Sequence, residues 1–143
     1  MSQSIGKIRN SRLNPVRWGM KTHRDLLAWQ RARSVAKGVI ELSISAWRPQ
    51  FPAVFAQLQR SSLSVQLNIA EGYPFFSDSG HWRNHLRIAY GSAIETDDLL
   101  NLMNDFEHFR NAGVLNTLKQ CQESQQLLFG LMKKFGALKQ QRE

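Results

Sequence analysis

The histidines are the first side chains to test for chemistry, because an imidazole ring can bind a metal or carry a proton near neutral pH. His81 and His85 are four residues apart, so a helix would place both on one face, although no HExxH pattern surrounds them. Asp105 and His108 form one carboxylate–histidine pair, whereas a di-iron site in a helical bundle needs two such pairs and two further carboxylates. We therefore predict no metal site and no cofactor. A metalloenzyme built on these four residues stays an alternative that a metal analysis of the purified protein would remove.

Other catalytic patterns are absent from the sequence as well. It contains no phosphate-cradling glycine loop, no nucleophile elbow and no paired acid and base. Its one cysteine, Cys121, excludes an internal disulfide and a cysteine-based zinc site. We expect a protein that is not an enzyme.

The distribution of charge points to a partner instead. Residues 1–37 carry nine basic side chains and one acidic one, whereas residues 38–143 carry ten of each, so the net charge of +8 sits in the first quarter of the chain. A basic arm favours binding to a polyanion, because each lysine or arginine docked on a phosphate releases a condensed counterion. The alternative is a tail that serves only solubility.

Length and composition limit the architectures that the chain can adopt. A chain of 143 residues with 42% hydrophobic and 21% charged residues is typical of one globular domain. No stretch approaches the roughly 18 apolar residues of a membrane span, and the N-terminus lacks a secretory signal, so we expect a cytoplasmic protein. We predict a flexible basic tail over residues 1–20 and a domain over residues 21–143. Met20 would serve as an alternative start.

Apolar periodicity predicts four helices and no strand. The predicted helices run from Thr22, which would cap the first, to Ala46; from Ala53 to Glu71; from Asp78 or Ser79 to Arg110; and from Val114 to Leu138. Short loops between four helices favour an all-α, antiparallel, up-down-up-down four-helix bundle.

Three of the predicted helices have sequence patterns that packing within a single four-helix bundle does not explain. The apolar arc of the first covers about half its circumference, more than one neighbour would cover. The third has Gly91 in its middle. Glycine in a helix interior lowers helix stability by about 1 kcal/mol relative to alanine, so we expect a packing reason for it. The second has two apolar stripes, one of them Ala56, Leu63 and Leu67, separated by a polar ladder: Gln57, Arg60, Ser64, Asn68 and Glu71.

Three separated motifs are similar to one known family. They read QLQRSSLSVQLNIAEG at 57–72, DLLAWQRA at 25–32 and AYGSAIE at 89–95. Together they resemble the four-helix-bundle family first named for proteins encoded within intervening sequences of 23S ribosomal RNA genes. The resemblance spans about residues 21–110, with Tyr90 standing where the family often carries arginine.

The resemblance implies an assembly and partners. Members of this family resemble the accessory variability determinant of diversity-generating retroelements, a homopentameric barrel that binds nucleic acid and a reverse transcriptase. A pentamer would explain the wide apolar arc of the first helix and the two stripes on the second. The polar ladder, together with Ser92 and Glu95, then becomes a candidate hydrogen-bonded seam within or between protomers.

These observations leave two main hypotheses. The leading one is a non-enzymatic oligomeric scaffold that binds RNA or DNA and accompanies a reverse transcriptase. The other is a protein-interaction module with an acidic protein partner and no direct role in nucleic-acid binding. Under the first hypothesis, phosphates would be contacted, without base readout, by Arg12, Arg17, Lys21, Arg24, Arg31, Lys37, Arg83 and Arg87.

Overall fold

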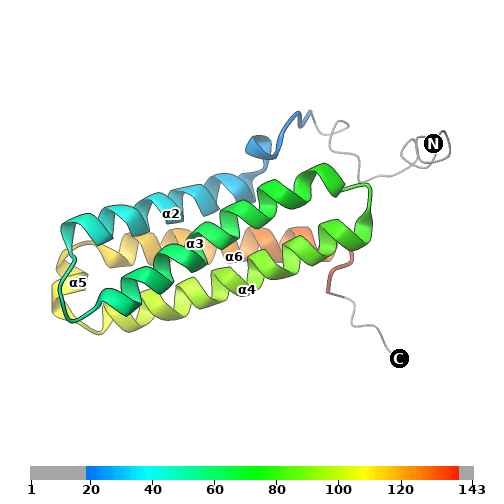
Figure 1. The fold of residues 1–143 in the computed structure, drawn as a ribbon. Helices are drawn as coiled ribbons and strands as arrows, with labels where there is room; N and C mark the ends of the chain where they lie inside the picture. Colours follow the sequence, from blue (N-terminus) through cyan, green and yellow to red (C-terminus); the bar gives the residue numbers. More distant parts are fainter. Residues whose placement is uncertain (1–18, 139–143) are drawn as a thin grey trace, which may run out of the picture.

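The computed structural model describes residues 19–138, and within them every regular element is helical (Figure 1). This confirms the predicted all-α class. None of the described helices is both long enough and apolar enough to span a membrane. The α-helices are α2 (Leu27–Ser45), α3 (Pro52–Gly72), α4 (Ser79–Asn104), α5 (Glu107–Asn111) and α6 (Val114–Lys134), with 3-10 turns η2 (His23–Asp25) and η3 (Tyr73–Phe75).

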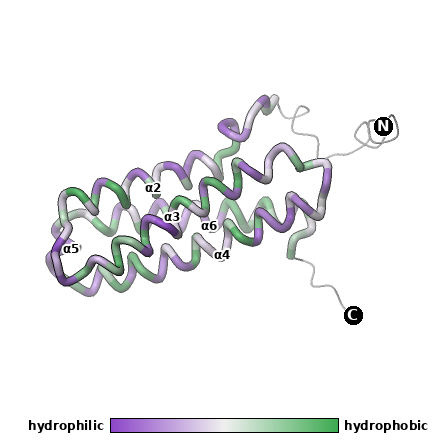
Figure 2. The backbone as a smooth tube through the Cα atoms, viewed as in Figure 1, coloured by the Kyte–Doolittle hydropathy of each residue, from purple (hydrophilic) through white to green (hydrophobic). Residues whose placement is uncertain are grey.

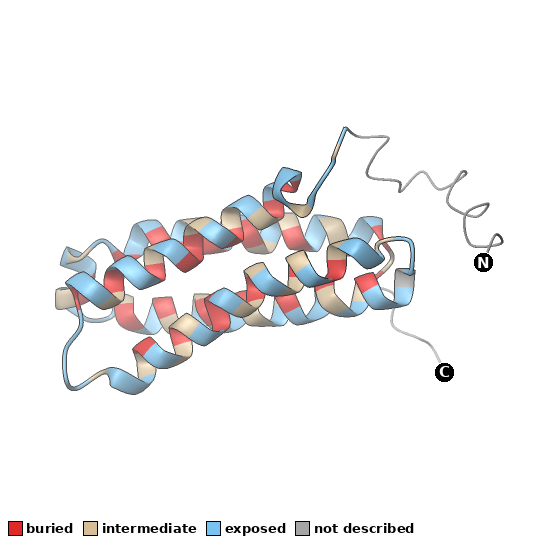
Figure 3. Cartoon of the chain, turned by 45° about the horizontal axis from the view of Figure 1, so that its top comes forward, coloured by how far each residue is buried: buried red, intermediate tan, exposed pale blue. Residues whose placement is uncertain are grey.

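Four long helices lie side by side, and successive ones run in opposite directions (Figure 1). Helix α2 packs against α3 and α6, and α4 packs against the same two helices. Hydrophobic and hydrophilic residues alternate along each helix in Figure 2, and the buried residues form stripes in Figure 3. The side chains that fill the space between the helices are completely or almost completely buried, among them Trp82, Leu86, Leu58, Leu100 and Phe109.

The first helix begins later than its cap residues predict. The Thr22 hydroxyl accepts from the Arg24 amide at 3.2 Å, and the Asp25 carboxylate accepts from the Lys21 and Thr22 amides at 2.7 and 3.0 Å. These bonds close η2 only, because Leu26 is extended, with φ −74° and ψ 124°, and α2 starts one residue later. The predicted start at Thr22 is therefore wrong for the α-helix.

The amide hydrogen bonds of this cap depend on the Asp25 charge. The N–H groups of Thr22 and then Lys21 lower the pKa of Asp25 below its ordinary value. A lowered pKa means that the cap's contribution is complete above the ordinary aspartate pKa and is lost as the pH falls through the lowered value.

The third predicted helix is wrong at its C-terminal end. Helix α4 stops at Asn104, Phe106 is extended, and the separate helix α5 follows. The break turns Phe109 into the core, where it is fully buried and packs edge-to-face on Phe51 and Phe55. After α5 the chain turns through Gly113, whose φ of +88° favours glycine, so the predicted helix stop before residue 114 is confirmed.

Cys121 belongs to the core between α4 and α6. Its thiol donates to the Ala93 carbonyl at 3.4 Å, and burial raises its pKa to about 12. The thiol stays protonated at neutral pH and fills space in the core.

Candidate functional site

A network of polar side chains joins α3 to α4. The Ser64 and Ser92 hydroxyl oxygens lie 2.8 Å apart, and the Asn68 amide nitrogen donates to the Ser64 carbonyl at 2.8 Å. That bond turns the Asn68 amide oxygen toward His85 Nδ1, 3.0 Å away. An amide oxygen only accepts, so His85 Nδ1 carries the hydrogen in this arrangement.

A second hydrogen-bonded group adjoins this network, closer to the start of α3. Gln57 donates through Nε2 to Glu95 Oε1, and Arg60 Nη2 donates to Gln57 Oε1 at 2.8 Å. Deeper in the interface, Thr96 Oγ1 lies 2.8 Å from both Ser61 Oγ and the Ser92 carbonyl oxygen. We call the residues of this network the α3–α4 seam: Gln57, Arg60, Ser61, Ser64, Asn68, His85, Ser92, Glu95 and Thr96.

Six of the seven residues grouped by the sequence pattern are joined in this seam, all within one chain. Glu71 is exposed at the last turn of α3, and no hydrogen bond joins it to the seam in the described part of the chain. Sequence reasoning missed Ser61, His85 and Thr96. His85, Ser92 and Thr96 are spaced seven and four residues apart, which is a helical repeat and the signal that would have grouped them.

The histidines are held by other contacts. His81 stacks on Phe75, with ring centroids 4.7 Å apart. His108 bonds through Nε2 to the Ala46 carbonyl at 2.9 Å and through Nδ1 to Arg48 at 3.1 Å, so both ring nitrogens are committed. Among the described residues no three histidine, cysteine, aspartate or glutamate side chains lie together as metal ligands would.

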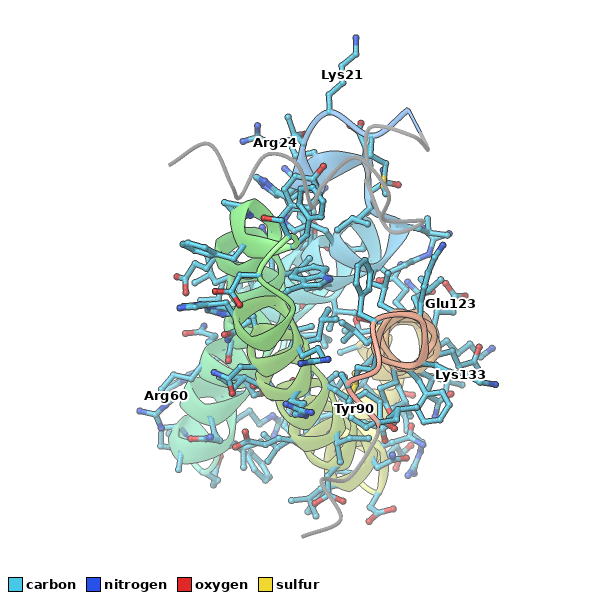
Figure 4. The ribbon with its side chains drawn as sticks, turned by 90° about the vertical axis from the view of Figure 1, so that its right-hand side faces the viewer. Lys21, Arg24, Arg60, Tyr90, Glu123 and Lys133 are labelled. Carbon is cyan, nitrogen blue, oxygen red and sulfur yellow. The ribbon has the colours of Figure 1, made fainter. Side chains whose placement is uncertain are left out.

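The predicted phosphate-binding residues lie in different parts of the structure. Lys21 and Arg24 are exposed beside η2, and Arg83 and Arg87 lie in the first turns of α4, where Arg87 Nε donates to the Ala137 carbonyl at 3.1 Å. These four come from the end at which α2 and α4 begin and α3 and α6 end (Figure 1). Figure 4 views the molecule from that end, with Lys21 and Arg24 projecting from its upper edge and Lys133 from its side.

The other predicted residues are placed differently. Arg31 Nε pairs with Glu123 at 2.9 Å, and Lys37 Nζ lies 3.9 Å from Glu41. Both cations therefore face a carboxylate of their own chain. Arg12 and Arg17 lie outside the described residues.

The two halves of the molecule differ in charge. We call the half formed by residues 19–36, 62–91 and 124–138 the basic end, because it carries eight basic and three acidic side chains. The other half, residues 37–61 and 92–123, carries five basic and seven acidic ones. The described chain is therefore polarised along its long axis, and a polyanion would be attracted to one end.

Part of the predicted apolar surface is exposed in the described part of the chain. Ile44 near the end of α2 and Trp47 just after that helix are 78% and 53% exposed. On α3, Leu63 and Leu67 are 38% and 49% exposed, so only the other stripe of this helix is buried by its own chain. Clustered exposed apolar side chains of this kind mark contact surfaces.

The family of the chain follows from a comparison with known families. The model for the 23S rRNA-intervening sequence protein family matches residues 24–130, well over half of the chain. The chain belongs to the 23S rRNA-intervening sequence protein family. The predicted family is thereby confirmed. A search of curated proteins finds no match.

The region shared with the 23S rRNA-intervening sequence protein family contains most of the described elements. It begins in η2 and ends in α6, so it includes the whole α3–α4 seam together with Arg83 and Arg87. Lys21 and the basic residues before it lie outside the match. The match therefore includes the seam and most of the helices, and the strongly basic N-terminal segment lies outside it.

Proposed function

We propose that this 23S rRNA-intervening sequence protein is a non-enzymatic, homo-oligomeric scaffold that binds RNA or DNA through its basic end. Each protomer is an antiparallel, up-down-up-down four-helix bundle over residues 21–143 preceded by a basic tail over residues 1–20. Five protomers form a cytoplasmic ring that accompanies a reverse transcriptase, as in the accessory proteins of diversity-generating retroelements.

The polarised charge carries this proposal. The chain enters its described part at Gly19, at the basic end, and the preceding residues 1–18 carry four further basic side chains and no acidic one. Lys21, Arg24 and Arg83 then supply cations for phosphates, which positions a nucleic acid without reading its bases. Copies in a ring would repeat this charge, so weak single contacts sum through multivalency.

The exposed apolar side chains support the oligomeric part. The α2 and α3 surfaces around Ile44, Trp47, Leu63 and Leu67 would be covered in a ring by a neighbouring protomer. Hydrogen bonds inside the α3–α4 seam hold α3 in place within each protomer, so its outward side is free to meet that neighbour.

A binding titration across a salt series tests the nucleic-acid role. We expect labelled structured RNA and duplex DNA to bind the full chain at low salt, with little sequence preference. Affinity should fall steeply as salt rises, because counterion release dominates phosphate binding. Fluorescence anisotropy measures the affinity and its dependence on salt. Absence of binding to either nucleic acid at low salt would overturn the proposal and favour an acidic protein as the partner.

A further inference from the structure

The outward side of α3 carries an ordered row of four residues. Arg60, Leu63, Leu67 and Glu71 follow one another at steps of three or four, so they lie on one side of the helix. All four are exposed, and Arg60 projects away from the helices in Figure 4. The row runs from a cation through two leucines to an anion.

A matching row lies on the outward side of α4. Arg87, Gly91, Ile94 and Asp98 follow at steps of three or four, and all are exposed, with Ile94 exposed by 44%. This row also runs from a cation to an anion. In each row the last member lies eleven positions after the first, a distance of about 16 Å in both helices.

The order of charges selects one relative direction. If the two rows meet antiparallel, Arg60 faces Asp98 and Glu71 faces Arg87 at the same time. If they meet in parallel, cation faces cation and anion faces anion, which disfavours the contact. Arg60 already donates one N–H to Gln57, and a guanidinium group has five N–H donors, so others remain for a carboxylate.

Gly91 supplies an independent observation. Glycine is a poor helix former, and a Cβ at this position would meet no atom of residues 19–138 within 4 Å, so packing among these residues does not explain it. In the antiparallel register, Leu67 lies seven residues after Arg60, and Gly91 lies seven residues before Asp98. Leu67 therefore falls opposite the glycine, whose missing side chain leaves room for it.

We infer that the outward row of α3 in one copy packs antiparallel against the outward row of α4 in a second copy. The inference rests on the proposed assembly and names its contact. The two rows are different surfaces of one chain, so the contact is heterologous and repeats from copy to copy, as closure into a ring requires.

Charge reversal tests the register. Arg60→Glu and Asp98→Arg should each weaken self-association about tenfold or more, whereas the double variant should regain the wild-type mass, because the pair is restored with opposite polarity. Lys119→Glu, an exposed charge reversal on α6, should leave the mass unchanged. Light scattering across a concentration series measures the mass, and circular dichroism verifies that each variant is folded.

A substitution at Gly91 gives a second test that does not involve charge. Gly91→Leu and the matched control Gly130→Leu both place a better helix former at an exposed helical glycine with no atom within 4 Å of its Cβ position. Neither should lower the melting temperature of the protomer. Only Gly91→Leu should reduce the mass of the assembly.

The outcomes separate this inference from the proposed function. A wild-type oligomer whose mass is unchanged by the single charge reversals and by Gly91→Leu would overturn the register and leave the scaffold standing. A double charge variant no more assembled than the single variants would also overturn the register. A wild-type chain that stays monomeric at every concentration would overturn both.

Discussion

Replacing Lys21 and Arg24 together by alanine is expected to lower the affinity for RNA about tenfold or more at low salt. Both side chains are exposed at the basic end, next to the point where four further basic residues join the described chain. The salt dependence should weaken as well, since each lost phosphate contact lowers the slope of log affinity against log salt by about one. Their backbone groups form the cap of η2, and alanine leaves that backbone in place.

A matched variant makes this prediction specific to the basic end. Lys37→Ala with Lys119→Ala removes the same charge from the opposite half, where acidic side chains outnumber basic ones. Lys37 was grouped with the phosphate contacts from sequence, but in the structure it lies 3.9 Å from Glu41. We expect this variant to bind RNA nearly as well as the wild type. Equal losses in the two variants would show that net charge alone attracts the nucleic acid.

Replacing Asn68 by leucine is expected to lower the free energy of unfolding by about 1 kcal/mol, the typical net contribution of an intramolecular hydrogen bond. The half-buried Asn68 amide donates to the Ser64 carbonyl and faces His85 Nδ1, so its removal ends the Asn68–His85 bond between α3 and α4 and leaves His85 Nδ1 without this partner. A loss of this size lowers the melting temperature by several degrees in a domain of this length. Thermal unfolding followed by circular dichroism measures it.

Asn101→Leu is the control for this change. Asn101 is exposed on α4, and its amide bonds Asp97 of its own helix, so water replaces the lost bond at little cost. If the two variants unfold at the same temperature, the seam contributes no more than a surface hydrogen bond, and its role in holding α3 against α4 is wrong.

The polar ladder on α3 illustrates what spacing predicts and what it does not. Helical periodicity groups Gln57, Ser64 and Asn68 on one side without knowledge of the fold. Their partners depend on how α4 is rotated about its own axis, and the packing of Trp82 and Leu86 in the core sets that rotation. Ser61 and Thr96 were missed for a different reason: they occupy buried positions at which apolar side chains are usual.

Helix ends show where tertiary packing overrides local signals. Thr22 and Asp25 form the capping bonds that their spacing predicts, but the chain straightens at Leu26, which buries its side chain before α2 begins. At the other end of the molecule, burial of Phe109 breaks the long helix that periodicity alone would continue. Local helix propensity predicts neither helix end, because the stabilising contacts join residues that are far apart in the sequence.

The sequence shows how much charge the chain carries, but it does not show which charged residues meet in space. The excess of basic residues in the first 37 positions is visible in the sequence, whereas Arg83 and Arg87 join them only because α4 begins at the same end. The Arg31–Glu123 pair likewise forms across α2 and α6, between residues that the sequence alone does not bring together.

The most direct test of an oligomeric nucleic-acid-binding scaffold is the mass of the full chain by light scattering coupled to size exclusion, with and without structured RNA across a salt series. The account predicts a ring of about five protomers that moves onto RNA at low salt and releases it as salt rises. A particle that remains a single protomer, or a ring whose mass is unaffected by RNA and duplex DNA at low salt, would contradict it.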